Sequence, residues 1–224
     1  MENPWHKLPL EQPYVLPEDK ADVEQFNFRR GSKDDFKIRL EILPEPYLGR
    51  PNSPVVVLNL NPGFNSKDSK QHAEPRFAEL SRGNLLHREA MYPFYLLDPT
   101  IDRTFWWEKK LKDLIREFSQ QIVSNNVLCV EFFPYHSRKF KNCGRVLHSQ
   151  QYSFWLVRQA IQRDAVILIM RSERRWLDQI PELESYPRRY TASSVQNPMI
   201  TKKNFGEGFS AAVRAISGSL EVQC

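Results

Sequence analysis

Apolar residues along the chain form short continuous runs that alternate with stripes at helical spacing. The runs at residues 55–60, 127–133 and 165–170 are rich in aliphatic side chains, as in parallel strands that are covered on both faces. A shorter run at residues 190–195 predicts a fourth strand. Turn-forming Pro62 and Gly63 end the first run, and Pro134 ends the second.

Three segments between and after these runs have apolar positions spaced as on one face of a helix. The first begins at Thr104, the second has Ser149 as its expected N-cap, and the third begins at Asn204, with Glu207 three residues later. The stripes are Trp107, Leu111, Leu114, Ile115, Phe118 and Ile122 in the first segment, Tyr152, Trp155, Leu156 and Ala160 in the second, and Phe205, Phe209, Ala212, Val213 and Ile216 in the third.

The alternation of these strands and helices predicts an α/β fold, a three-layer α/β/α sandwich around a mainly parallel sheet of about four strands. Right-handed crossovers then bring the carboxyl ends of the strands to one edge of the sheet. Ligands of such sheets bind in the crevice outside that edge. The segments that directly follow each strand are therefore where we look for chemistry.

The first 50 residues lack this alternation of apolar runs and helical stripes, and they contain many of the 16 prolines. Proline removes a backbone donor and fixes φ, so residues 1–50 are expected to form an irregular arm packed on the domain. Residues 36–43 alternate well enough to predict an edge strand or a short helix within the arm. We expect the α/β domain to cover residues 51–217, followed by a tail at 218–224.

Composition excludes several classes of protein. The chain has 224 residues, 41% of them hydrophobic, which argues against disorder as its main character. Its longest aliphatic run, residues 165–170, is far shorter than the ~20 residues of a membrane span, and the N-terminus has no apolar core typical of a secretory signal. Three scattered cysteines do not make a disulfide framework or an iron–sulfur cluster. We expect a cytoplasmic monomer without metal or cofactor.

The chain carries 32 Lys and Arg against 27 Asp and Glu, a formal charge of +5. This mild excess matters because basic residues gather after the predicted strands, where they could neutralise phosphates. They are Arg138, Lys139, Arg171, Arg174, Arg175, Lys202 and Lys203. The alternative is that loops after strands are polar simply because they are exposed.

Two Asn-Pro pairs follow the first and the last predicted strand. Residues 55–64 read V-V-V-L-N-L-N-P-G-F, and Asn197, Pro198 and Met199 follow the fourth strand. The first segment resembles the first motif of the uracil-DNA glycosylase superfamily, and is closest to the G-x-N-P-G form of its mismatch-specific and single-strand-selective branches. The second stands where that superfamily has His-Pro-Ser or Asn-Pro-Ser. The order of elements agrees over about residues 50–217.

The resemblance implies cleavage of the N-glycosidic bond of a damaged or mismatched base that is flipped out of DNA into a pocket. Asn61 would hold the attacking water, and Asn197 would donate to the oxyanion that develops on the departing base. The resemblance also assigns a pocket, an apolar wedge and a set of phosphate contacts. The pocket comprises Asn59, Pro62, Gly63, Phe64, Phe77, Tyr135 and His136, the wedge region comprises Pro198, Met199 and Ile200, and the phosphate contacts comprise Arg138, Arg171, Arg174, Arg175, Lys202 and Lys203.

The chain also departs from that pattern. Asn59 stands where the superfamily usually has glycine, and Met199 stands where serine is expected. The second strand has no asparagine to read a pyrimidine edge, so the preferred base stays open. Two other functions stay open as well: a non-catalytic nucleic-acid-binding relative, and a hydrolase or transferase for a small nucleotide-like molecule.

One further pair, His136 and Ser137, has the residue types of a base and a nucleophile. Adjacent residues rarely reach the geometry that activation requires, so a polar role for His136 in the crevice is the preferred interpretation.

Overall fold

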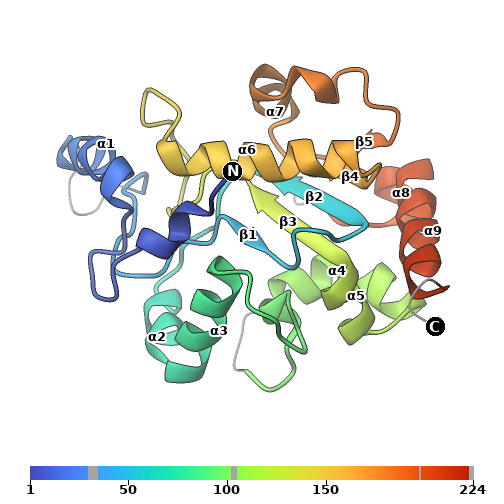
Figure 1. Ribbon diagram of the computed structural model, residues 1–224, viewed down its shortest axis with the longest axis horizontal. Coiled ribbons are helices and arrows are strands. Elements are labelled where there is room, and N and C mark those ends of the chain that lie inside the picture. The colour runs from blue at the N-terminus through green and yellow to red at the C-terminus, as the bar shows by residue number, and fades with distance from the viewer. Residues whose placement is uncertain (30–34, 102–104, 197, 222–224) are drawn as a thin grey trace. The chain divides into compact units, whose positions relative to one another are not determined.

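The computed structural model describes residues 1–29, 35–101, 105–196 and 198–221 (Figure 1). Its α-helices have the following bounds: α1 Pro17–Phe28, α2 Asp68–Ala73, α3 Pro75–Leu85, α4 Trp106–Glu117, α5 Gln120–Asn126, α6 His148–Gln162, α7 Glu173–Gln179, α8 Lys202–Phe205 and α9 Glu207–Glu221. The strands are β1 Tyr47–Leu48, β2 Val55–Asn59, β3 Val127–Glu131, β4 Val166–Ile169 and β5 Arg189–Thr191. Short 3-10 helices cover Pro4–Lys7, Tyr95–Leu97 and Pro181–Leu183.

The strands form one sheet in the order β1-β3-β2-β4-β5, with helices flanking it (Figure 1). Strands β2, β4 and β5 are parallel, with Val55 opposite Val166 and Ile167 opposite Arg189. The predicted α/β class with a mostly parallel sheet is therefore confirmed, with five strands instead of about four. The added strand is the two-residue β1, which is too short to leave a pattern in the sequence.

The order of the strands places a topological switch at the centre of the sheet. From β2 the chain moves to β3 on one side, and then crosses to β4 on the other side. Every residue of β2, β3 and β4 is buried, as the continuous apolar runs predicted. In an open parallel sheet the crevice outside such a switch is the usual ligand site, which directs attention to the ends of β2 and β4.

The contacts within the chain separate it into two compact units. The first comprises Met1–Tyr47, Leu60–Arg88 and Glu131–Trp155, and the second comprises Leu48–Asn59, Glu89–Val130 and Leu156–Cys224. Neither unit is continuous in sequence, because the chain passes between them five times. The second unit holds nearly all of the sheet, and the first holds the segments that follow β2 and β3.

Two of the predicted helices are interrupted, each for a local reason. The stripe that begins near Thr104 does not run on to Ile122 as one helix, because α4 ends at Glu117 and the Ser119 hydroxyl accepts a hydrogen bond from the Ile122 amide at the start of α5. Thr104 itself lies outside the described residues. Gly206, with φ of 53°, separates α8 from α9, and Thr201 is the N-cap where Asn204 was expected.

The second predicted helix is confirmed as α6, but it begins one residue before its expected cap. The Leu147 amide donates to Gln150 Oε1 at 2.9 Å, which satisfies one of the amides at the start of the helix. Ser149 is the second helical residue and its amide donates to Asp19 Oδ1.

The N-terminal segment is more regular than its prolines predicted. It contains α1, which starts with Pro17 at its first position, where the missing amide costs nothing. Residues 36–43 contain neither the strand nor the helix that their alternation predicted. They run instead beside the segment after β3, where the Arg39 amide donates to the His136 carbonyl and the Glu45 amide to the Pro134 carbonyl.

Candidate functional site

Asn61 lies in the first unit, in the loop that follows β2, and its side chain is oriented by two hydrogen bonds. Its Nδ2 donates to the Pro62 carbonyl at 2.9 Å and to Ser137 Oγ at 3.2 Å. These bonds engage both hydrogens of the carboxamide, which fixes the direction of the remaining group, the acceptor Oδ1. The half-buried side chain can therefore accept a hydrogen bond from a water molecule and hold that water in a defined direction.

The segment 135–137 holds the Asn-Pro-Gly turn in place from the other side. His136 Nδ1 lies 2.7 Å from the Gly63 carbonyl, and the Ser137 amide donates to the Pro62 carbonyl at 3.4 Å. Because a carbonyl only accepts, His136 Nδ1 carries the hydrogen and Nε2 is the unprotonated nitrogen. His136 therefore fixes the loop that presents Asn61.

This tautomer bears on the alternative in which His136 activates Ser137. Nδ1 is engaged by Gly63, and Nε2 is buried without a hydrogen-bond partner among the described residues. The Ser137 hydroxyl accepts from Asn61 instead. The geometry thus favours the positioning role of His136 over a nucleophile–base pair.

Two histidines of the first unit are kept uncharged by their surroundings. Burial lowers the pKa of His136 to about 4, against the opposing effect of the Gly63 and Leu43 carbonyls. Burial and the neighbouring His136 lower the pKa of His72 to about 2. The two rings meet edge to face, with centroids 5.2 Å apart. At neutral pH these two imidazoles are therefore neutral polar groups and not cationic acids.

The three aromatic residues predicted for the pocket differ in their exposure. Phe64 is half-buried, and the guanidinium carbon of Arg39 lies 4.6 Å from its ring centroid. Phe77 is buried in α3 against His72. Tyr135 is fully buried, with its hydroxyl donating to Asp19 Oδ2 and accepting from the Leu16 amide. Phe64 is thus the member of this group with ring surface available to a ligand.

Gly63 leaves space beside the turn. A Cβ added to this residue would meet no heavy atom within 4 Å. Pro62 is buried, so the open space lies at the glycine, between the two residues that the turn presents, Asn61 and Phe64.

In the second unit, the end of β2 is held by a buried tryptophan. Trp176 in α7 is fully buried and its Nε1 donates to the Asn59 carbonyl at 2.9 Å. Asn59 is itself 5% exposed. Its predicted place in a pocket therefore leaves it almost no surface to contact a ligand in this conformation.

The residues of the second unit that were predicted for the wedge also differ in their exposure. Ile200 is fully buried and its amide donates to the Lys110 carbonyl, whereas an intercalating side chain has to project. Pro198 is buried as well, and Met199 keeps partial exposure. Asn197 lies outside the described residues.

Most of the predicted phosphate contacts do have exposed side chains. In the second unit these are Arg174, Arg175, Lys202 and Lys203, and in the first unit Arg138. Arg174 forms an ion pair with Asp178 at 2.9 Å in the same helix. Arg171, directly after β4, is only half-buried, and its Nε is enclosed.

Three residues of interest had no distinct signal in the sequence. Arg39 belongs to the proline-rich segment, His72 lies alone in a short polar helix, and Lys110 sits among other charged residues of α4. Their positions follow from tertiary packing. Among the described residues, no cluster of three or more potential metal ligands occurs, and no helix is long and apolar enough to cross a membrane.

Comparison with family models, with curated proteins and with solved structures finds no match to this chain.

Proposed function

We propose that the protein hydrolyses the N-glycosidic bond of a damaged or mismatched base flipped out of DNA. The proposal starts from the resemblance of residues 55–64 and 197–199 to the motifs of the uracil-DNA glycosylase superfamily. The observation that carries it is the orientation of Asn61, whose Nδ2 is engaged by Pro62 and Ser137 so that Oδ1 is left as the acceptor of the side chain.

In this mechanism the Asn61 oxygen accepts a hydrogen bond from a water molecule. The lone pair of the water oxygen is thereby directed at the C1′ carbon of the sugar. The bond from C1′ to the base nitrogen breaks, a bond from C1′ to the water oxygen forms, and the base leaves with the bonding electrons. The water proton finally reaches the base. An amide is a poor base, so most of the rate must come from stabilising the departing anion, the role that the resemblance gives to Asn197.

The surroundings of Asn61 suit this role. His136 and His72 are neutral at pH 7, because burial lowers their pKa values to about 4 and about 2. A neutral imidazole does not donate a charged hydrogen bond to the lone pair of the water, so that lone pair stays available to the sugar carbon. Gly63 leaves room beside the turn, and the half-buried Phe64 offers a ring on which a base could stack.

The test is a panel of oligonucleotides that carry uracil, a mismatched thymine or hypoxanthine, in single and double strands. The proposal predicts abasic sites that break with alkali for at least one lesion. Intact strands across the whole panel, from protein that binds the same DNA, would favour the non-catalytic nucleic-acid-binding alternative. That alternative is favoured by the exposed basic side chains Arg138, Lys202 and Lys203, which need no chemistry to hold phosphates.

The third alternative, an enzyme acting on a small nucleotide-like substrate, makes a different prediction. Nucleotides would then raise the melting temperature by linkage, and DNA would bind weakly without preference for a site. A cytoplasmic setting and a monomeric state also stay predictions.

A further inference from the structure

Two segments of the first unit that are far apart in sequence run side by side next to the Asn-Pro-Gly loop. The Arg39 amide donates to the His136 carbonyl, and the Lys139 amide donates to the Asp35 carbonyl, each at 2.9 Å. The bonded partners advance in opposite directions along the chain, so the two segments are antiparallel. Because His136 Nδ1 also lies 2.7 Å from the Gly63 carbonyl, this pair of segments is joined directly to the candidate site.

Basic side chains are concentrated on these two segments, residues 35–41 and 136–141, which we call the paired segments. They carry five cations against two carboxylates. The cations are Lys37, Arg39, Arg138, Lys139 and Lys141. The three in the second segment have exposed side chains, and the two in the first segment are partly exposed. The paired segments therefore present a surplus of positive charge to solvent.

The two carboxylates of the paired segments neutralise only part of this charge. Lys139 Nζ forms an ion pair with Asp35 at 2.9 Å. Arg39 Nη1 lies 3.8 Å from Glu41 Oε1, a separation too long for a hydrogen bond. The remaining cations have no carboxylate partner among the described residues, and these are Lys37, Arg138 and Lys141. The surplus is thus available to an anionic partner.

The Arg39 guanidinium contacts the loop of the candidate site. Its carbon atom lies 4.6 Å from the ring centroid of Phe64, three residues after Asn61. The Arg39 side chain is 18% exposed, and its Nε is enclosed without a hydrogen-bond partner in the part of the chain that the structure describes. A buried guanidinium N–H that lacks an acceptor is rare in folded proteins, and a phosphate oxygen is an acceptor that suits it.

Aromatic rings lie beside these cations. Lys141 Nζ is 5.8 Å from the ring centroid of Phe36, as Arg39 is close to Phe64, and both rings are partly exposed. Cations with aromatic rings beside them are the combination by which proteins hold single nucleic-acid strands, because phosphates contact the cations and bases stack on the rings. A duplex keeps its bases stacked inside, so it could use the cations but not the rings.

We propose that the paired segments form a binding surface for single-stranded nucleic acid. Arg39 contacts a phosphate next to the base that stacks on Phe64, and Arg138 and Lys141 contact phosphates further along the strand. The surface delivers the strand to Asn61. That last step rests on the proposed function, whereas the binding of the strand does not.

The first experiment follows the anisotropy of a labelled oligothymidylate of about 12 nucleotides, and of a duplex of the same length, as salt is varied. The wild-type protein should bind the single strand at least about tenfold more tightly than the duplex. Arg39→Gln, Arg138→Gln and Lys141→Met should each reduce the slope of log K against log salt for the single strand by about 0.7, because each removes one phosphate contact.

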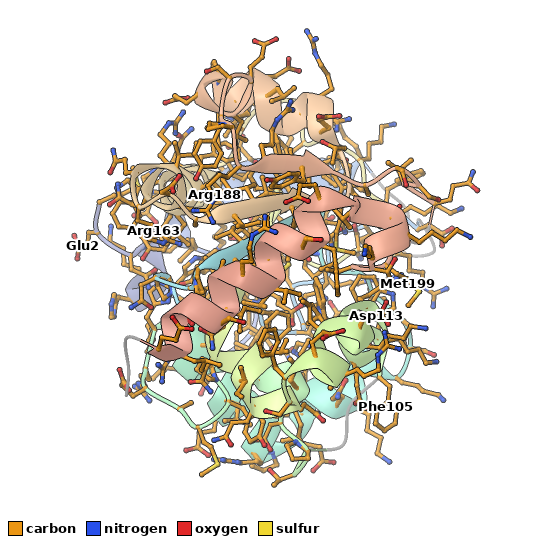
Figure 2. The ribbon with its side chains drawn as sticks, turned by 90° about the vertical axis from the view of Figure 1, so that its right-hand side faces the viewer. Glu2, Phe105, Asp113, Arg163, Arg188 and Met199 are labelled. Atoms are coloured by element: carbon orange, nitrogen blue, oxygen red, sulfur yellow. The ribbon has the colours of Figure 1, made fainter. Side chains whose placement is uncertain are left out.

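Two control variants make the same changes of charge elsewhere. Lys20→Met alters an exposed lysine of α1 in the same unit. Arg188→Gln alters a partly exposed arginine of the second unit that pairs with Asp164 (Figure 2). Both controls should keep the wild-type slope, so a reduced slope that is confined to the paired segments identifies the surface.

The contribution of the ring is measured separately from that of charge. Phe64→Leu should lower the affinity for the single strand about tenfold and leave the salt slope unchanged, because the ring stacks on a base and carries no charge. Phe28→Leu, at a phenylalanine of α1 that is 91% exposed, is the matched control and should bind as wild type does. A lower salt slope in Phe64→Leu would contradict a stacking role.

Three results would overturn the proposal. The first is an unchanged salt slope in Arg138→Gln and Lys141→Met, whose exposed side chains can be replaced even if Arg39→Gln lowers the melting temperature. The second is equal affinity for single strand and duplex, since only a single strand reaches the rings. The third is equally tight binding of an acidic peptide, polyglutamate, at the same salt, which would show a surface for acidic protein segments.

These results are separable from the outcome of the glycosylase panel. Abasic sites formed by a protein whose single-strand binding does not depend on the paired segments would overturn this surface and leave the proposed function standing. Single-strand binding that depends on Arg39, Arg138 and Lys141, in a protein that processes no lesion, would support the surface and overturn the glycosylase proposal.

Discussion

The Asn-Pro-Gly loop of the first unit and the sheet of the second unit use the same kinds of residue in opposite ways. Gly49, directly after β1, has φ of 107°, and a Cβ there would overlap the Val127 carbonyl oxygen. Gly63 has no positive φ, and a Cβ there would meet nothing within 4 Å. One glycine is required by close packing of the backbone, and the other leaves a space open.

The charges of the two regions differ in the same way. Beside the loop, burial keeps His136 and His72 neutral. In the second unit, the buried Lys110 places its Nζ 4.9 Å from the ring centroid of Trp106. The two regions therefore differ in the charge of their buried polar groups: two neutral imidazoles lie beside the loop, whereas a buried ammonium group lies against a tryptophan ring in the second unit.

The largest expected effect on stability comes from substituting the closely packed glycine, Gly49. Gly49→Ala should lower the free energy of unfolding by about 3 kcal/mol or more, because it combines a disfavoured φ with a backbone clash against β3. Denaturant titration measures the change. A loss below about 0.5 kcal/mol would show that β1 and β3 are not packed as described.

A somewhat smaller effect on stability is expected when the pH is lowered, because His136 beside the loop then binds a proton. The pKa of His136 falls from 6.5 to about 4 on folding, so the unfolded state binds the proton more tightly. The free energy of unfolding is therefore not reduced by His136 above pH 6.5, and it declines as the pH falls towards 4. By pH 4.5 the loss from His136 should be about 2–3 kcal/mol.

His136→Asn isolates this contribution, since its amide can still donate to the Gly63 carbonyl but does not titrate. His87, whose pKa is lowered by its own burial, remains in the variant and cancels in the comparison. His72 loses the part of its pKa shift that His136 causes, which further reduces the loss of stability in the variant. The variant should lose less stability than wild type between pH 7 and 4.5. An identical pH profile for the two proteins would contradict the burial of a neutral His136.

The smallest effect on stability is expected at Gly63. Gly63→Ala should change the free energy of unfolding by less than about 0.5 kcal/mol, because the space around it is open. If that space receives the substrate, the same variant should lower kcat/KM on the active lesion at least about tenfold. Gly83→Ala, inside α3, serves as the control and should leave activity unchanged. Full activity in Gly63→Ala would place the substrate elsewhere.

The sequence predicted the sheet well because its central strands are buried on both faces. Residues 55–60, 127–133 and 165–170 needed no tertiary information, and β2, β3 and β4 lie within them. The helix α1 was missed because its few buried side chains, including Val23 and Phe26, do not make a visible stripe. The break between α4 and α5 was missed because the apolar spacing continues across Phe118 while the backbone turns there.

The site was predictable only in part. Asn61, Gly63 and Phe64 were found because they follow a recognisable strand, and they do share one loop. The contacts of Arg39 with Phe64 and of His72 with His136 join segments far apart in sequence, which no local pattern encodes. Ile200, which the resemblance places in the wedge region, is packed in the interior, and an apolar residue beside a predicted site has no local pattern that distinguishes these two positions.

The central claim is that Asn61 holds the attacking water, and Asn61→Ala tests it most directly. Single-turnover rates and DNA affinities are measured on the lesion that the panel identifies, with Asn65→Ala, at an exposed asparagine of the same loop, as the matched control. We predict a rate about 100-fold lower for Asn61→Ala, with DNA affinity within about twofold of wild type and Asn65→Ala unaffected. An unchanged rate in Asn61→Ala would contradict the account.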